Sequence, residues 1–142
     1  MRLILTNFNN VLGLRGYISF AENKPLLIYG ENIAGKSNII NVLRYCLIPK
    51  VKEKKGYTEE KRLNKNEILL EKNSVGNVEI YFEQREKFYK LYYSFSRKSK
   101  NVGQIQRLYE SDKTDLPERD EEKIHALKNL PWKDLGVSSS KS

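Results

Sequence analysis

The residues with the clearest chemical meaning form the segment Gly30-Glu31-Asn32-Ile33-Ala34-Gly35-Lys36-Ser37. Their spacing fits the pattern G-x-x-x-x-G-K-[ST], in which a glycine-rich loop joins a strand to a helix. The backbone N–H groups of such a loop, with the unpaired donors of the helix N-terminus, make a cradle for anions. Lys36, the candidate catalytic residue, can reach the outer phosphates of a nucleotide, and the Ser37 hydroxyl can coordinate Mg2+. The segment therefore predicts a site for a nucleoside triphosphate, ATP, with Mg2+.

The flanking residues supply the elements that this motif requires. The apolar run at residues 26–29 predicts a strand that enters the loop. Apolar residues then recur with a helical period at Ile39, Ile40, Leu43 and Leu47, which predicts a helix from residue 36 to about residue 47. Pro49 prevents its continuation.

The remaining segments predict an α/β chain with much antiparallel β-structure. We expect strands at residues 2–8 and 17–20, with a loop bracketed by Gly13 and Gly16 between them. Further strands are expected at 76–83, 87–97 and 104–110, with a hairpin turn at 83–87. An acidic first turn after Pro117 opens a helix that Pro131 ends, and residues 136–142 are expected to be flexible. We divide the chain into a phosphate-loop core (1–48), a mobile basic loop (49–66), a β-rich subdomain (67–111) and a helix with connector (117–136).

Composition points to a polyanionic partner. The chain has 142 residues and a formal net charge of +8 at pH 7, which favours DNA or RNA as a ligand. Basic residues gather in the predicted mobile loop, which either contacts a phosphate backbone or is a solvated insertion; they are Lys50, Lys52, Lys54, Lys55, Lys61, Arg62 and Lys65. The aromatic and basic residues that alternate in strands 87–97 and 104–110 are either a stacking platform for nucleic acid or ordinary strand residues.

The same composition argues against several other classes. No long apolar segment or signal peptide is visible, so we expect a soluble, cytoplasmic protein without a membrane partner, nucleoid-associated in a prokaryote. Cys46 is the sole cysteine and lies among apolar helix positions, which predicts a role in core packing.

Residues 1–48 resemble the N-terminal lobe of the SMC-type ATPase heads, the structural-maintenance-of-chromosomes proteins and their double-strand-break-repair relatives. The resemblance rests on a first strand carrying Asn7-Phe8, on a third strand ending in Gly30-Glu31-Asn32, and on Gly35-Lys36-Ser37-Asn38. It continues more loosely over residues 76–136. Such heads are ABC-type P-loop ATPases that bind ATP between two engaged heads and act on DNA.

The resemblance also implies roles for individual residues. Loop contacts to the nucleotide would come from Gly30, Asn32, Ile33, Ala34, Gly35 and Lys36, with Ser37 on the magnesium ion and Asn38 on a phosphate. Two features depart from the family pattern. Ile33 stands where glycine or asparagine is usual, and Asn9 and Asn10 follow Asn7-Phe8 where a basic residue is usual. Arg15 is a candidate substitute for that basic residue.

A complete head needs further motifs that the 142 residues do not contain. No apolar strand ends in an Asp-Glu pair, no segment resembles Leu-Ser-Gly-Gly, and the glutamines lie outside the context of a glutamine loop. We therefore expect half of an ATPase, which pairs with a C-terminal lobe from the same or a second chain and engages a second copy on ATP. Two alternatives stay open: a basic β-rich nucleic-acid-binding module whose loop holds backbone phosphate, and a small P-loop kinase or GTPase.

Overall fold

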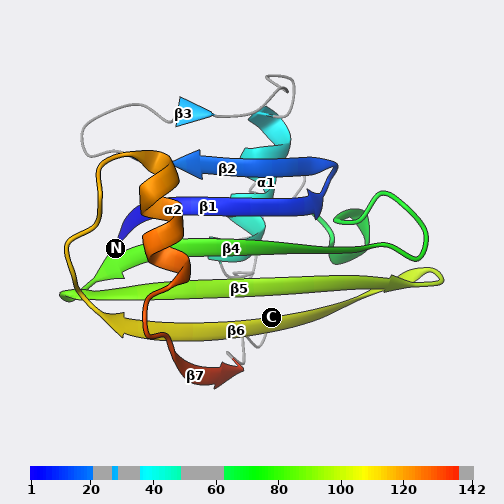
Figure 1. The fold of residues 1–142 in the computed structure, drawn as a ribbon. Coiled ribbons are helices and arrows are strands. Elements are labelled where there is room, and N and C mark those ends of the chain that lie inside the picture. Colours follow the sequence, from blue (N-terminus) through cyan, green and yellow to red (C-terminus); the bar gives the residue numbers. More distant parts are fainter. Residues whose placement is uncertain (21–26, 29–35, 49–62, 138–142) are drawn as a thin grey trace, which may run out of the picture.

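The computed structural model describes residues 1–20, 27–28, 36–48 and 63–137 of the chain (Figure 1). In chain order its elements are β1 (Arg2–Val11), β2 (Leu14–Ser19), β3 (Leu27–Ile28), α1 (Lys36–Leu47), a short 3-10 helix (Lys65–Glu67), β4 (Val75–Gln84), β5 (Lys87–Lys98), β6 (Asn101–Asp112), α2 (Asp120–Lys128) and β7 (Lys133–Val137). The predicted helix after the phosphate loop is thus confirmed at both ends.

All described strands belong to one antiparallel sheet. Its seven strands follow the order β3-β2-β1-β4-β5-β6-β7, and each neighbouring pair is antiparallel. β1 pairs with β2 on one side and with β4 on the other. The strands that lead to the phosphate loop and the hairpin strands that follow it therefore share a single sheet.

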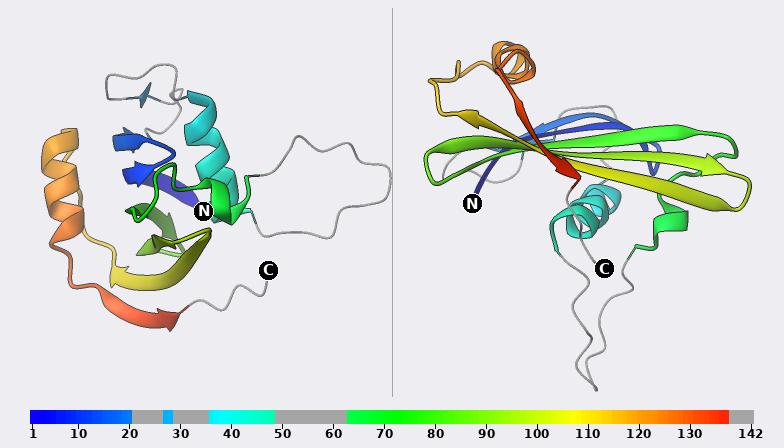
Figure 2. Two further views of the ribbon diagram at one scale, coloured as in Figure 1. Left: turned by 90° about the vertical axis from the view of Figure 1, so that its right-hand side faces the viewer. Right: turned by 90° about the horizontal axis from the view of Figure 1, so that it is seen from below.

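The two helices cover opposite faces of this sheet, as the two views of Figure 2 show. On the α1 face, Ile39, Val42 and Cys46 pack in the larger core. Its sheet residues include Phe8, Val11, Ile18, Val78, Ile80, Tyr93 and Phe95. On the α2 face, Leu127 packs with Ile4, Leu5, Tyr81 and Phe88. We refer below to the α1 face and the α2 face of the sheet.

The hairpin strands confirm the alternation read from the sequence. Val78, Ile80 and Phe82 of β4 are buried in the α1-face core, whereas Tyr81 belongs to the α2-face core. β4 ends at Gln84 and β5 begins at Lys87, so the predicted hairpin turn is also present. β5 and β6 pair over their whole lengths, from Lys87 with Asp112 to Lys98 with Asn101.

β2 corrects the predicted loop around two glycines. The connection from β1 is a tight turn at Leu12 and Gly13, with φ of 50° and 73°, and the strand begins at Leu14. Gly16 lies inside β2, opposite Phe8, with φ of 131°. The predicted loop was wrong because glycine can keep its place in a strand at a φ that other residues rarely adopt.

The C-terminal segment brings a second correction. Gly136 and Val137, predicted to be flexible, belong to β7, which pairs with β6 through Asp134 opposite Tyr109. The sequence of β7 does not alternate, so its pairing with β6 defines it. α2 confirms the predicted acidic first turn, and it ends at Lys128, before Pro131.

The predicted basic loop is described only at its end. Residues 49–62 and 138–142 lie outside the described residues. The 3-10 helix at Lys65–Glu67 overlaps the end of the segment predicted as loop, 49–66. The Arg97 guanidinium donates to the carbonyl oxygens of Asn66 and, at 2.6 Å, of Leu69, so β5 holds this turn in place.

Candidate functional site

The strand and helix that flank the G-x-x-x-x-G-K-S segment are present in the order that the motif requires. β3 pairs with β2, with Ile28 opposite Ile18 and Leu27 opposite Ser19. α1 begins at Lys36, the lysine of the motif. Five predicted site residues, Gly30, Asn32, Ile33, Ala34 and Gly35, lie outside the described residues, so their contacts remain predictions.

The first turn of α1 is suited to an external anion. Ser37 is exposed and Asn38 is half-buried. α1 has no acidic residue in its first turn, whereas α2 carries Asp120, Glu121 and Glu122 there. Acidic side chains normally stabilise a helix N-terminus by meeting its partial positive charge. In α1 no acidic side chain of the first turn meets that partial positive charge, and such a helix N-terminus favours anions such as phosphate groups.

The C-terminal half of α1 is fixed to β5 and β6. The Tyr93 hydroxyl on β5 donates to the carbonyl oxygen of Cys46 at 3.0 Å. The Tyr45 hydroxyl on α1 donates to Oε1 of Gln104 on β6. Neither tyrosine belongs to the G-x-x-x-x-G-K-[ST] motif at residues 30–37. Tyr45 does not belong to the apolar period of the helix at Ile39, Ile40, Leu43 and Leu47. A tyrosine at such a position was the one feature of the sequence that could have indicated a polar contact here.

Arg15 is separated from the start of α1 by the sheet. It is exposed and pairs with Asn9, in regular register with Tyr17 opposite Asn7. Tyr17 packs with the α2-face core, while Ile18 packs with the α1-face core. Arg15 therefore lies on the α2 face, and the structure does not bring it together with Ser37 and Asn38.

The aromatic residues of β5 divide between the two faces. Tyr93 and Phe95 are buried in the α1-face core, and Tyr89 packs against that core. Tyr92 is half-buried on the α2 face, where cross-strand pairing sets it opposite Glu79 and Arg107. Only part of the predicted stacking platform is therefore available to a ligand.

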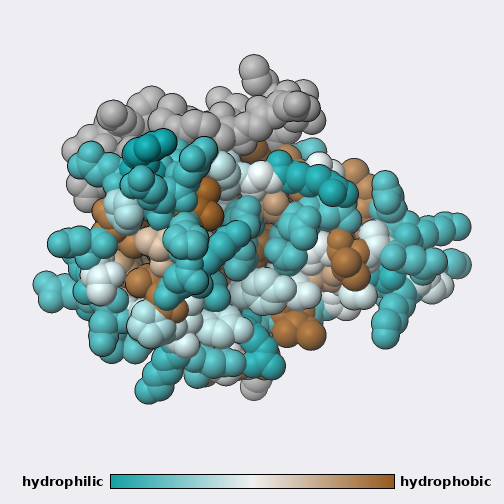
Figure 3. Space-filling view, in the orientation of Figure 1, coloured by the Kyte–Doolittle hydropathy of each residue, from teal (hydrophilic) through white to brown (hydrophobic). Residues whose placement is uncertain are grey.

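α2 leaves part of its face of the sheet uncovered, toward the turn between β1 and β2 (Figure 1). We call this part the open face and define it by Arg15, Tyr92, Ile105, Arg107 and Tyr109. Arg15 and Ile105 are exposed and the other three are half-buried. Figure 3 shows mostly hydrophilic residues on this side of the molecule. The Arg107 guanidinium pairs with Asp134 at 3.1 Å.

Lys90 lies at the edge of the open face, between two aromatic rings. Its ammonium group is 4.4 Å from the ring centroid of Tyr109 and 5.3 Å from that of Trp132. Burial lowers the pKa of Lys90, and the nearby Glu79 carboxylate opposes that change. Cation–π contacts of this kind keep an ammonium group at a partly buried aromatic surface.

Cys46 has a packing role, as predicted. It is buried on α1 and packs in the α1-face core. Burial raises the pKa of its thiol, which keeps the thiol protonated and unreactive.

The described β3 and an α1 that begins at the lysine of the G-x-x-x-x-G-K-[ST] motif are the two elements that a P-loop nucleotide-binding domain places on either side of that motif. A model of the AAA domain family matches residues 2–137. The chain therefore belongs to this family of P-loop ATPases, and ATP binding follows at the level of the family. A comparison with curated proteins gave no match. No helix among the described residues is long and apolar enough to cross a membrane.

Proposed function

We propose that the chain is the ATP-binding N-terminal lobe of an SMC-like, ABC-type ATPase head that acts in DNA binding, chromosome organisation or DNA repair. One observation carries the ATP-binding part of this proposal. In a member of the AAA domain family, Lys36 and Ser37 of the motif are the first two residues of α1, whose first turn lacks acidic side chains. The SMC-like part rests on the Asn7-Phe8 and Gly35-Lys36-Ser37-Asn38 resemblance.

The chemistry proposed for the chain's own residues is binding and charge neutralisation. Lys36 holds the outer phosphates, Ser37 provides a hydroxyl ligand to Mg2+, and N–H groups at the start of α1 donate to phosphate oxygens. Bound Mg2+·ATP would supply the phosphoryl group that is transferred to water. Asn38 is proposed to contact a phosphate, and Lys36 is the residue on which catalysis depends most.

Titration with a non-hydrolysable ATP analogue and Mg2+ tests the ATP site. Lys36→Ala should weaken binding by about 100-fold or more, because it removes the only ammonium group that the motif directs at the phosphates. Lys72→Ala is the matched control, since Lys72 is exposed in the segment between the 3-10 helix and β4. Equal affinity of wild type and Lys36→Ala would contradict the proposed site.

The proposed partner is a C-terminal lobe, in the same or a second chain, that supplies an Asp-Glu pair and a signature segment. In these 142 residues no apolar strand ends in an Asp-Glu pair, Asp120-Glu121 lies in the first turn of α2, and no segment resembles the signature. Positioning and charge neutralisation account for nearly all catalysis of phosphoryl transfer. The isolated chain should therefore turn over far more slowly than about 1 per second. Phosphate release near that rate would show that no second lobe is needed.

A nucleic-acid-binding function is the second candidate, and the open face favours it. Tyr92 and Tyr109 present aromatic rings on strands that also carry Arg107 and Lys90. Single-stranded nucleic acids bind to surfaces of this composition through base stacking and phosphate contacts. The open face and the start of α1 are on opposite sides of the sheet, so both functions are compatible in one molecule.

A further inference from the structure

We infer that Tyr93 and Tyr45 are positioning residues for nucleotide binding, because they fix the end of α1 opposite to Lys36 and Ser37. The inference rests on the proposed ATP site and names residues that neither the motif nor the family match assigns. Both tyrosines act through α1.

Tyr93 satisfies a backbone carbonyl that the helix cannot satisfy itself. The last carbonyl groups of an α-helix lack partners within the helix, and Cys46 belongs to the last turn of α1. Its carbonyl oxygen accepts the 3.0 Å hydrogen bond from Tyr93, a side chain that is 4% exposed. Water has little access to this position, so the tyrosine hydroxyl is the partner that the buried carbonyl oxygen requires. This hydrogen bond fixes the distance between the last turn of α1 and the sheet.

Tyr45 fixes the rotation of the same turn. Its ring meets the ring of Tyr93 edge-on at 6.3 Å and that of Phe95 at 6.2 Å. Tyr93 and Phe95 are themselves stacked at 5.9 Å. With the hydrogen bond from Tyr45 to Gln104, the last turn of α1 is tied to both β5 and β6.

A rigid helix transmits this constraint to Lys36 and Ser37 in its first turn. α1 has 12 residues and spans about 18 Å from Lys36 to Leu47. A shift or rotation at its last turn therefore moves the first turn by a similar amount. Binding of phosphate and Mg2+ depends on placing an ammonium group and a hydroxyl group within fractions of an ångström.

The test uses Tyr93→Phe and Tyr45→Phe in the whole chain, with Tyr89→Phe as matched control. Tyr89 lies on β5 and on the same face, but its ring stacks on Phe82. Two quantities are measured well below the melting temperature: the Kd of a Mg2+-bound ATP analogue and the Kd of the analogue with Mg2+ chelated. We expect Tyr93→Phe and Tyr45→Phe to weaken Mg2+-dependent binding by about threefold to tenfold, with Tyr89→Phe within about twofold.

A purely structural role would change the melting temperature and leave the Kd unchanged. Unchanged Kd in both variants, or an equal loss in Tyr89→Phe, would overturn the inference. If Tyr93→Phe fails to fold, Tyr45→Phe and Gln104→Leu answer the same question. If the wild type binds the analogue, Lys36→Ala abolishes that binding, and Tyr93→Phe and Tyr45→Phe both keep the wild-type Kd, the inference is rejected while the proposed function stands. Failure of the wild type to bind the analogue would reject the proposed function and the inference together.

Discussion

Gly76 of β4 lies against the backbone of β1 near Asn9 and Asn10. A Cβ atom at this position would lie 2.4 Å from the carbonyl oxygen of Asn10 and 2.9 Å from that of Asn9. Asn10 has φ of 56°, and its side-chain amide donates to the Val75 carbonyl at 2.8 Å. The irregular end of β1 is thus fixed against β4, and only glycine fits opposite it.

Gly76→Ala should lower the free energy of unfolding by about 2–4 kcal/mol, because backbone atoms have to move to admit the methyl group. Gly103→Ala is the control, since a Cβ there meets nothing closer than the Ser96 carbonyl oxygen at 3.7 Å. It should change stability by less than about 1 kcal/mol. Chemical denaturation monitored by circular dichroism measures both values. Equal effects of the two substitutions would refute this account of Gly76.

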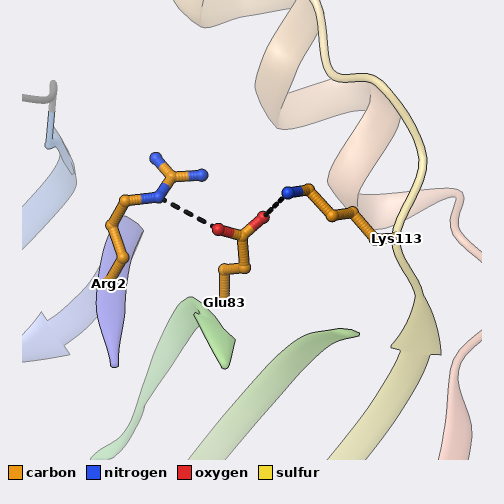
Figure 4. Close-up of polar contacts among 3 residues, drawn as sticks. All are labelled: Arg2, Glu83 and Lys113. Carbon is orange, nitrogen blue, oxygen red and sulfur yellow. Dashed lines mark hydrogen bonds and ion pairs between the residues drawn. The ribbon is translucent and has the colours of Figure 1, made fainter. Parts of the chain in front are cut away.

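Glu83 joins three segments through two ion pairs, shown in Figure 4. Its carboxylate lies 3.3 Å from Nε of Arg2 at the start of β1 and 2.9 Å from Nζ of Lys113 after β6. The carboxylate side chain is 17% exposed, whereas both cations are more than 40% exposed. Hydrogen bonds from Lys113 and then Arg2 lower the pKa of Glu83, although partial burial acts in the opposite direction.

The lowered pKa of Glu83 predicts the sign of an acid effect. Its contribution to stability is complete above the unfolded pKa of about 4.3 and is lost as pH falls through the folded pKa. Glu83→Gln should therefore cost about 1 kcal/mol at pH 7, and the difference from wild type should shrink between pH 5 and 3. Thermal melts across this range measure it, with the exposed Glu71→Gln as control. A difference that stays constant with pH would show that the ion pairs do not stabilise the fold.

The β4–β5 hairpin is closed by a turn whose residues are poorly suited to its backbone. Arg85 and Glu86 have φ of 52° and 62°. Two consecutive positive φ values define a type I′ turn, for which Asn-Gly is the preferred pair. A side chain with Cβ is disfavoured in this region, so the turn is strained and the long β4–β5 pairing holds it in place.

Replacing Arg85-Glu86 by Asn-Gly should stabilise the fold by about 1–2 kcal/mol, because both residues then tolerate positive φ. Chemical denaturation gives the value. An Ala-Ala replacement at the same positions removes the same charges and keeps both Cβ atoms, so it should not stabilise the fold. If Ala-Ala matched Asn-Gly, charge rather than backbone conformation would explain the effect.

The sequence predicted those elements whose patterns are local. α1 has a helical apolar period and Pro49 beyond its end, and the alternation at Val78, Ile80 and Phe82 reflects a strand with one face in the core. Local sequence patterns did not predict the parts of the sheet whose structure depends on pairing between segments far apart in the sequence. β7 is defined by pairing with β6, and Gly16 stays in β2 because Phe8 pairs with it. The sequence predicted that α1 begins at Lys36, but the role inferred for Tyr93 depends on a contact with a residue 47 positions away in the sequence.

At the scale of the whole molecule, one sheet separates two kinds of surface. The α1 face carries the helix that begins at Lys36, and the open face carries Arg15, Tyr92, Arg107 and Tyr109. The formal net charge of +8 favours polyanions in general. A nucleotide and a nucleic acid would therefore bind on different sides of the sheet. β5 contributes to both sides, with Tyr93 on the α1 face and Tyr92 on the open face.

This separation predicts that nucleic-acid binding does not depend on the phosphate loop. Single-stranded DNA should bind with an affinity that falls steeply with salt, because phosphate contacts release counterions. Tyr92→Ala should weaken it by about tenfold through lost stacking, and Arg15→Ala should reduce the salt slope by about 1. Lys36→Ala should leave the affinity for single-stranded DNA and its salt slope unchanged. Fluorescence anisotropy at two salt concentrations, with and without the ATP analogue, measures them. Competition between the analogue and DNA would instead indicate that the loop itself binds backbone phosphate, which is the alternative reading of the motif.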